Sequence, residues 1–425
     1  MDTNQPPRYF FQDSENSPAN FILVHKPSKE IFMSILHPAA SLYKSVTESK
    51  SVTQCFRNLM AVLINKGIKV KTVRECLKIN RQALEELAFE CLTYELADED
   101  KNDSKDKNDK YKYYLSDEYK RTVIKKLWIG QLVDVVLTQP KYVLRYVDKN
   151  TFIEPASINF KPLGNLLFCR DQQITTKKGV VMGRSISIQR EIEHKIMKLV
   201  YKNLNANVIG QVPEGAFIEG GDFFALNPEL SLMGVGLRTN IKGANYLMEK
   251  DLLGTRKFAI IYDESDLDLQ RMHLDTYFNV LNSKYVMVLD FEDCAKVTKK
   301  QIKRKVYLYS NARNIKAITL DEKSKSAGIS ETVGEYKIIS VFDDFYSYIK
   351  SEGYEMIKIS HKQQLESMIN FLNIGNGTIL TVNPELKNIV KDIDVEVIFV
   401  EFSAVMEMYG ALHCATQVSR KLSIV

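Results

Sequence analysis

Four short segments of the sequence contain residue types that could carry out chemistry, and they lie at 165–171, 214–224, 271–278 and 409–417. The last of them holds Cys414 directly after His413. A cysteine attacks through its thiolate, which needs electropositive and partly accessible surroundings. Cys414 is therefore a candidate nucleophile, and a buried, unreactive cysteine is the alternative.

The first two segments place carboxylates next to apolar residues. In segment 165–171 an apolar run, which we expect to be a strand, ends at Asp171. Functional groups often lie where a strand ends, although Asp171 could instead cap the following turn. In segment 214–224, Glu219 and Asp222 flank two glycines that permit a close backbone approach. Poorly solvated carboxylates can bind a cation or move a proton; a hairpin turn with exposed acids is the alternative.

The third segment holds His273 and Asp275, two positions apart. In an extended strand these side chains would face the same side, and an imidazole beside a carboxylate suits general acid–base catalysis. A purely structural hydrogen bond is the alternative. Taken together, the four segments could bind a planar cation and attack its electrophilic carbon. A guanidinium group fits because it offers only donors to the carboxylates.

Composition excludes several other classes of protein. The chain has 425 residues, of which 45% are hydrophobic and 26% charged, and its net charge is +5. This excess is too small to predict a nucleic-acid partner. No apolar run reaches the length of a membrane span, and the N-terminus lacks the pattern of a signal peptide. The six cysteines are scattered without a Cys-x-x-Cys pair, so we expect no metal site, no disulfide framework and a cytoplasmic location.

Strand-like and helix-like segments alternate along the chain, which predicts an α/β or α+β fold. Runs of β-branched and aromatic residues predict strands at 21–24, 68–70, 165–168, 180–182, 207–209, 258–262, 285–289, 337–341, 378–382 and 395–400. Helical periodicity is found at 53–65, 188–203 and 363–371. Residues 71 to about 145 show mostly helical periodicity, interrupted by a wholly polar tract at 98–110 that we expect to be a solvated loop.

The order and spacing of several motifs identify a family resemblance. The matching elements are Asn165 to Asp171, Met182 to Glu193, Ile218 to Asp222, Gly234 to Arg238, Met272 to Thr276, and His413-Cys414. On these motifs the sequence resembles the arginine deiminases of the guanidine-modifying (pentein) superfamily over nearly the whole chain. The combination of Met-His-Leu-Asp-Thr, Glu-Gly-Gly-Asp and a C-terminal cysteine is highly specific.

The resemblance implies a particular fold. It predicts an α/β protein built as a five-bladed α/β propeller (the pentein fold) of ββαβ units, with an inserted helical domain. Residues 1–70 would form the first part of the propeller, 71–150 the insertion with the polar loop at 98–110, and 151–425 the remainder.

The resemblance also implies a role for each site residue. Cys414 would attack the guanidine carbon, His273 would transfer protons, and Glu219 would hydrogen-bond the substrate and assist proton transfer. The carboxylates of Asp171 and Asp275 would grip the guanidinium nitrogens. Residues expected to bind the rest of the substrate are Phe168, near the guanidinium plane, and Asn165, Arg190 and Arg238, at the amino-acid end; Asp222 would be supportive.

The implied reaction converts L-arginine and water to L-citrulline and ammonia, without a metal or organic cofactor. The alternatives are a methylarginine hydrolase, an amidinotransferase, a peptidyl-arginine deiminase, or a catalytically silent interaction module of the same fold. The expected partner is the small molecule L-arginine, with no nucleic acid or membrane, and a homodimer is a base-rate expectation. The chain departs from the bacterial pattern at 39–44 and at Tyr409, where bacterial members carry a lid arginine.

Overall fold

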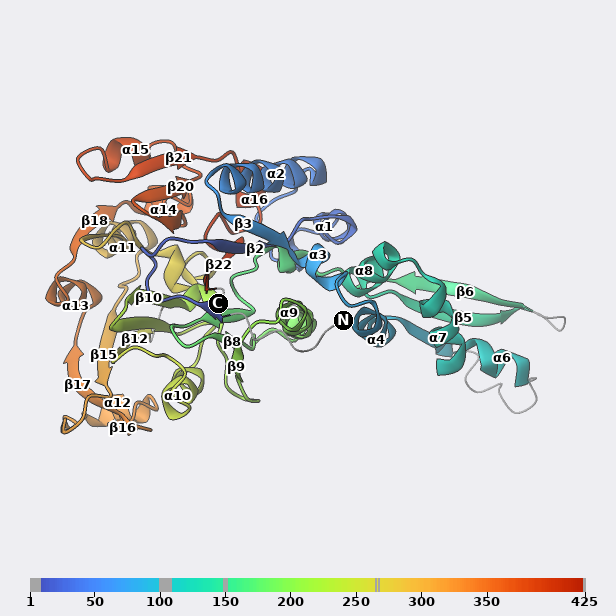
Figure 1. Cartoon of the computed structure of the whole chain (residues 1–425), viewed down its shortest axis with the longest axis horizontal. Coiled ribbons are helices and arrows are strands. Elements are labelled where there is room, and N and C mark those ends of the chain that lie inside the picture. The colour runs from blue at the N-terminus through green and yellow to red at the C-terminus, as the bar shows by residue number, and fades with distance from the viewer. Residues whose placement is uncertain (1–8, 99–108, 148–151, 264–265, 267, 423–425) are drawn as a thin grey trace.

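The repeating feature of the fold is a three-stranded sheet in which an antiparallel pair is followed by a parallel pair. A computed structural model describes residues 9–98, 109–147, 152–263, 266 and 268–422 (Figure 1). In one such sheet β7 (Gln173–Thr175) runs antiparallel to β8 (Val180–Met182), which runs parallel to β9 (Val208–Gln211). A 3-10 turn η3 (Ile188–Arg190) and helix α9 (Glu191–Asn203) connect β8 to β9.

The same order of pairing recurs in three more sheets of the described residues. Their strands are β10 (Phe223–Asn227), β11 (Leu230–Val235) and β12 (Lys257–Asp263); β13 (Phe278–Val280), β14 (Tyr285–Leu289) and β18 (Glu355–Ile359); and β19 (Leu372–Gly375), β20 (Thr378–Thr381) and β21 (Glu396–Phe399). Helices α10 (Ile241–Glu249), α11 (Phe291–Thr298) and α15 (Leu386–Ile389) follow β11, β14 and β20. Parallel neighbours require such crossover connections.

The two ends of the chain complete a further sheet together. The C-terminal strand β22 (Thr416–Leu422) pairs antiparallel with β2 (Phe21–Val24), and β2 pairs parallel with β3 (Lys69–Thr72). Helix α2 (Ser49–Asn65) connects β2 to β3, and β1 (Tyr9–Phe11) pairs with the other edge of β22. The residues just before β22 are thereby drawn into the middle of the fold (Figure 1).

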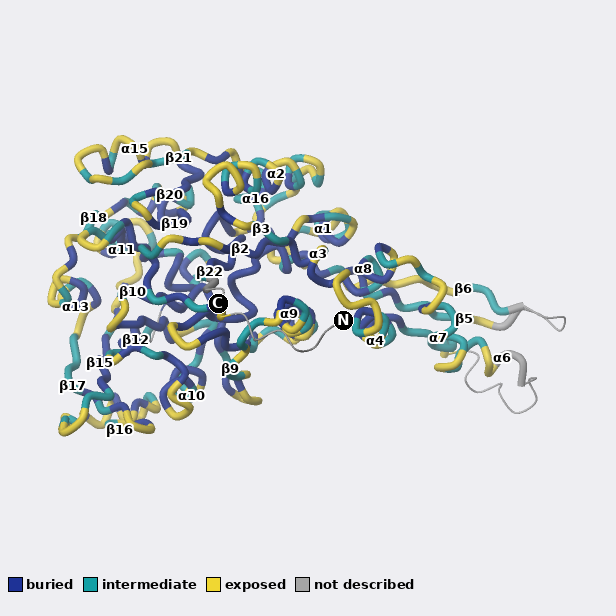
Figure 2. Tube along the Cα trace, in the orientation of Figure 1, coloured by how far each residue is buried: buried dark blue, intermediate teal, exposed yellow. Residues whose placement is uncertain are grey.

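Additional elements extend this framework on its outside. Strands β15 (Arg304–Ser310), β17 (Tyr336–Phe342) and β16 (Thr332–Val333) continue the sheet beyond β12. Further helices of the framework are α1 (Lys29–Ile35), η1 (Ala39–Ser41), α12 (Glu322–Ser326), α13 (Phe345–Ser351), α14 (His361–Leu365) and α16 (Ser403–Met406). Buried residues concentrate on the inner strands, while the peripheral helices expose their outer faces (Figure 2). No helix in the described ranges is long and apolar enough to cross a membrane.

The segment after β3 projects to one side of the framework (Figure 1). Its helices are α3 (Val73–Leu77), α4 (Arg81–Cys91), α6 (Asp109–Tyr114), α7 (Asp117–Lys126) and α8 (Ile129–Thr138). They pack beside a sheet of β4 (Thr93–Leu96), β5 (Lys141–Val147) and β6 (Phe152–Asn159), which helical periodicity did not indicate. Most of the polar loop expected at 98–110 lies outside the described residues.

Local sequence explains where several of these helices begin. Ser116 caps α7 by accepting a hydrogen bond from the Tyr119 backbone, with acidic residues in the first turn and lysines in the last. Thr72 and Glu75 form a capping box at α3. The strands expected at 21–24, 180–182 and 285–289 have those bounds in the structure. The strand expected at 165–168 is wrong, because these residues form the 3-10 turn η2 (Gly164–Leu167).

Candidate active site

The candidate catalytic residues lie in the loops and 3-10 turns that lead into the first strand of each three-stranded unit. Asp171, Asn370 and Cys414 each stand two residues before such a strand, which is β7, β19 and β22 respectively. Glu219 precedes η4 (Gly220–Asp222) and β10, and His273 precedes η6 (Leu274–Thr276) and β13. Equivalent positions in the repeating unit thereby bring together residues that are far apart in sequence.

Close packing between these loops requires the two glycines after Glu219. A Cβ atom on Gly220 would lie 1.9 Å from the Arg170 carbonyl oxygen, and one on Gly221 would lie 2.9 Å from the His273 ring. The Asp222 carboxylate accepts a hydrogen bond from the Leu274 backbone at 3.0 Å, which ties the two loops together. Glu219 and Asp222 are buried, so the hairpin turn with exposed acids does not occur.

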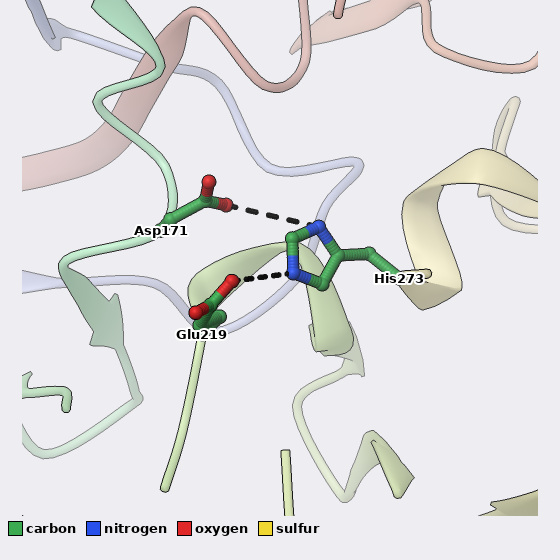
Figure 3. Close-up of side chains that lie close together, drawn as sticks. All are labelled: Asp171, Glu219 and His273. Carbon is green, nitrogen blue, oxygen red and sulfur yellow. Dashed lines mark hydrogen bonds and ion pairs between the residues drawn. The ribbon is translucent and has the colours of Figure 1, made fainter. Parts of the chain in front are cut away.

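Asp171, Glu219 and His273 face one another in the centre of the site (Figure 3). The His273 Nε2 atom lies 2.9 Å from Glu219 Oε2, and Nδ1 lies 4.0 Å from Asp171 Oδ1. The structure therefore places the carboxylates of Asp171 and Glu219 beside the imidazole of His273. Burial alone would lower the His273 pKa, but Asp171, Glu219 and Asp222 outweigh this effect and raise it to about 10. The imidazole is thus an imidazolium near neutral pH and can donate a proton.

The raised pKa of His273 makes stability depend on pH. The protonated state is favoured by folding, so its contribution is complete below the ordinary value of 6.5 and is lost as the pH rises through about 10. We expect the free energy of unfolding of the wild type to exceed that of His273→Gln by a margin that shrinks across this range. Chemical denaturation of both proteins between pH 6 and 10.5 measures this margin. A margin that grows with pH would show that His273 is neutral in the folded protein.

Arg190 contributes a buried cation to the same cluster. Its guanidinium lies 2.9 Å from Asp171 Oδ2, 2.9 Å from Glu193 Oε2 and 3.6 Å from Glu219 Oε2. These carboxylates raise the Arg190 pKa even though burial opposes the charge. Arg190 was expected at the amino-acid end of a substrate, whereas its guanidinium here contacts the acidic groups themselves.

Removing the Arg190 charge is expected to destabilise the fold. The Arg190→Met variant would leave buried carboxylates without their cation, and we expect a loss of about 3–5 kcal/mol in the free energy of unfolding. Arg238→Met is the matched control, because Arg238 lines the same cavity but is only partly buried. Urea denaturation of both variants checks the prediction. Equal unfolding midpoints would show that other groups balance the carboxylates.

Asp275 lies on the other side of the site, against Cys414. Its Oδ2 atom is 2.8 Å from His413 Nδ1 and 3.4 Å from Cys414 Sγ. The expected pairing of His273 with Asp275 on one strand is wrong, because His273 caps a 3-10 turn and pairs with Glu219 instead. Burial would raise the Asp275 pKa, but the hydrogen bond and charge of His413 lower it. Asp275 therefore remains a carboxylate beside the thiol.

Cys414 is 6% exposed and lines the cavity that most of the expected residues border. Burial, together with the charges of Asp275 and Asp171, raises the pKa of the Cys414 thiol well above its usual value. The unliganded site thus holds a thiol. A cation bound between the carboxylates would favour the thiolate.

The expected substrate-binding residues line this same cavity of about 60 Å³. It is bordered by Asn165, Phe168, Asp171, Arg190, Arg238, His273, Tyr409 and Cys414, among others. The Phe168 ring packs so closely on Gly410 that a Cβ atom there would lie 2.1 Å from Cε1. Glu219 and Asp275 lie behind the cavity wall, fully buried.

Three buried residues of the site were not predicted from the sequence. Asn370 contacts the Cys414 sulfur and backbone. His413, noted only as a neighbour of Cys414, links Asp275 to Glu15, whose Oε2 atom lies 4.0 Å from His413 Nε2. No signal in the sequence pointed to Asn370, because residues 363–371 were expected to form a helix, whereas α14 ends at Leu365 and Asn370 lies in the loop before β19. Glu15 has no signal either, because it comes from the N-terminal segment before β2.

Asp171, Glu219 and His273 also have the composition of a metal-ligand set, with one ligand atom of each within 4.8 Å of the others. The Arg190 guanidinium already neutralises two of these groups. A metal ion would also need the neutral imidazole of His273 as a ligand, whereas the raised pKa of His273 keeps it protonated near neutral pH.

Solved structures identify the class of fold. The chain resembles DDAH from Pseudomonas aeruginosa, a cysteine-to-serine mutant complexed with citrulline, with a TM-score of 0.52 and 10% identity over 94% of this chain and 99% of that chain. It also resembles the N-terminal domain of ArgZ, an arginine dihydrolase from cyanobacteria, with a TM-score of 0.51 and 12% identity over 94% of this chain and 96% of that one. At these identities the likeness shows the fold alone, which is the mixed α/β fold of the pentein class.

The sequence places the chain more narrowly. The family model of the arginine deiminases matches residues 41–420, so the chain belongs to the arginine deiminase family. It is 23% identical over 342 residues to the arginine deiminase of Halobacterium salinarum, covering 61% of this chain and 65% of that protein. It is 26% identical over 227 residues to that of Listeria monocytogenes, covering 52% of each. The chain thus spans between half and two thirds of the length of these relatives.

Proposed function

We propose that the protein hydrolyses L-arginine to L-citrulline and ammonia through a covalent intermediate on Cys414. The observation that carries this proposal is a set of unsatisfied acceptors. Asp171 Oδ1, Glu219 Oε1 and Asp275 Oδ1 are buried and have no hydrogen-bond partner among the described residues. Unpaired buried acceptors are costly. A guanidinium group supplies five donors and one positive charge, which matches this need.

The first half of the proposed reaction uses Cys414 and His273. With the guanidinium held by Asp171 and Asp275, the Cys414 thiolate attacks its central carbon and forms a tetrahedral adduct. The carbon–nitrogen bond to a terminal nitrogen then breaks, and the His273 imidazolium gives its proton to the departing ammonia. This leaves an S-alkylthiouronium on Cys414 and a neutral imidazole, which the Glu219 carboxylate at 2.9 Å keeps in position.

The second half releases the product. A water molecule takes the place of ammonia, and His273 removes its proton as the oxygen attacks the thiouronium carbon. The carbon–sulfur bond then breaks and the remaining hydroxyl proton of the adduct passes to solvent, where it converts the released ammonia to ammonium. This yields citrulline and restores the thiolate and the imidazolium. Holding thiolate and guanidinium together before reaction can contribute about 7–11 kcal/mol toward the barrier.

Binding of arginine in this way requires Arg190 to move. Its guanidinium lies on Asp171, where the substrate guanidinium would bind. We propose that Arg190 leaves Asp171 and, with Asn165 and Arg238, holds the α-carboxylate and α-amino end, while Phe168 packs near the guanidinium plane. Glu193, which already binds Arg190 at 2.9 Å, would remain as its anchor.

We further propose that the repeating three-stranded sheets are the five blades of an α/β propeller around this site. The segment expected at 71–150 would be an inserted domain, extended to include β6, which pairs with β5. The recurrence of the antiparallel and then parallel pairing supports the blades. The projection of the insertion away from the site supports the domain division (Figure 1). A cytoplasmic location and a homodimer stay predictions.

The test of this function is the stoichiometry of product formation from L-arginine. We expect citrulline and ammonia in equal amounts. Parallel assays with Nω-methylated arginine, agmatine and a peptide containing arginine distinguish the related hydrolases, and added glycine or ornithine distinguishes amidino transfer. If only one of these other compounds is turned over and L-arginine is not, that compound takes the place of L-arginine as the substrate. If no guanidine compound is turned over, the proposal is contradicted.

A further inference from the structure

Asn370 makes more contacts with the nucleophile than any group that the mechanism above uses. Its Nδ2 atom lies 3.1 Å from Cys414 Sγ, and its Oδ1 atom accepts a hydrogen bond from the Cys414 backbone at 3.2 Å. Its carbonyl accepts from the His413 backbone at 3.3 Å. The side chain is 5% exposed and borders a cavity together with Cys414. One residue thus holds both the backbone and the sulfur of the nucleophile.

The partners of the Asn370 amide determine which of its atoms faces the sulfur. Oδ1 meets the backbone N–H of Cys414, which can only donate, and Nδ2 meets the backbone carbonyl of Asp275 at 3.2 Å, which can only accept. With the amide turned over, Nδ2 would face the backbone N–H of Cys414, so that two donors meet. Oδ1 would face the backbone carbonyl of Asp275, so that two acceptors meet. The atom at the sulfur is therefore an N–H donor.

The backbone around Asn370 is held from both sides. Asn279 on β13 donates from Nδ2 to the carbonyl of Ile369 at 2.7 Å and to that of Phe371 at 2.8 Å. Asn279 is fully buried. The chain is therefore anchored on both sides of Asn370, which keeps its donor directed at the sulfur during a reaction that changes the sulfur's charge.

The surroundings of the sulfur give this donor a particular function. Asp275 lies 3.4 Å from Sγ, and its negative charge disfavours the thiolate. The thiol can donate to Asp275, whereas the thiolate can only accept. We propose that Asn370 is the residue that stabilises the Cys414 thiolate, through a hydrogen bond that is strong only when the sulfur is ionised. This proposal rests on the proposed role of Cys414 as nucleophile. It adds Asn370, in the loop before β19, to the residues of the site.

The experiment is alkylation of Cys414 by iodoacetamide in the full chain, with the modified residue located by peptide mass spectrometry. Second-order rate constants between pH 7 and 10 report the fraction of thiolate. We expect Asn370→Ala to lower the rate at a given pH by about tenfold to a hundredfold, the size of a hydrogen bond to a charged group. We expect isosteric Asn370→Asp to lower it further, because a carboxylate adds negative charge at the sulfur.

Asn373→Ala is the matched control. Asn373 is buried on the next strand and donates to the carbonyls of Val280 and Leu281, but it has no contact with the thiol. We expect its alkylation profile to stay within about twofold of the wild type. A general loosening of the fold would increase the access of iodoacetamide to Cys414 and raise the alkylation rate. That is opposite to the change expected for the Asn370 variants. If Asn370→Ala does not fold, the alkylation rate of Asn370→Asp alone tests the proposal.

Folded Asn370 variants with wild-type or faster alkylation would overturn the inference. The outcome is independent of turnover. A wild type that makes no citrulline while the variants show slower alkylation would contradict the proposed function and leave the Asn370 assignment in place. Citrulline formation by the wild type, together with unchanged alkylation rates in the Asn370 variants, would support the proposed function and overturn the Asn370 assignment.

Discussion

The Cys414→Ala variant is expected to form no citrulline, with turnover reduced by at least about 10⁴-fold. Without the thiolate, no covalent intermediate can form, and water would have to attack a guanidinium whose charge is delocalised. The substrate-binding carboxylates remain, so we expect L-arginine still to bind. Steady-state citrulline assays measure the turnover, and isothermal titration of the variant with L-arginine measures the binding.

Cys294→Ala is an informative control for this prediction. Cys294 is buried, and its sulfur lies 3.5 Å from His361 Nδ1, so the chain holds a thiol–imidazole contact outside the site. The acidic cluster of Asp171, Glu219 and Asp275 is what distinguishes Cys414. We expect Cys294→Ala to retain turnover. Substantial turnover by Cys414→Ala, or its loss in Cys294→Ala, would refute the assignment of the nucleophile.

Residue types and spacing marked four segments as candidates for the site, and the family resemblance assigned each residue its role. Cys414, His273, Glu219 and Asp171 carry groups whose chemistry is uncommon in a protein core, so their segments stand out before any fold is known. The structure brings all of them to one place. The pairing between them was not predictable, because it depends on 3-10 turns such as η6 whose geometry a short polar motif does not specify.

Neutral residues and long-range contacts were beyond sequence reasoning. Asn370 is uncharged and fell within the helix expected at 363–371, and only the closing of β22 onto β2 brings Cys414 to it. Strands such as β14 were predictable because buried parallel strands read as continuous apolar runs. The sheet of β4, β5 and β6 was not, because β6 is mostly exposed and contains Pro155, and the apolar residues of β5 lie in a region whose dominant periodicity is helical.

The Asp275→Asn variant is expected to change two measured quantities in opposite directions. Asp275 would hold the substrate guanidinium in a site sheltered from water, so we expect its loss to lower kcat/KM by about 10²–10³-fold. The same carboxylate lies 3.4 Å from Cys414 Sγ and raises the pKa of the thiol. Removing its charge therefore increases the thiolate fraction, and iodoacetamide should alkylate Cys414 faster at a given pH.

A lower kcat/KM together with faster alkylation distinguishes a residue that binds the substrate from one that only supports the fold. Asp266→Asn removes another buried carboxylate, one that binds Arg271 at 2.6 Å and Arg304 at 3.1 Å, and we expect it to lower the thermal midpoint without changing the alkylation profile. A generally weakened fold would lower kcat/KM and expose all six buried cysteines together. Selective alkylation at Cys414 with reduced turnover identifies Asp275 as both guanidinium ligand and restraint on the thiol. A wild-type kcat/KM would show that the guanidinium binds elsewhere.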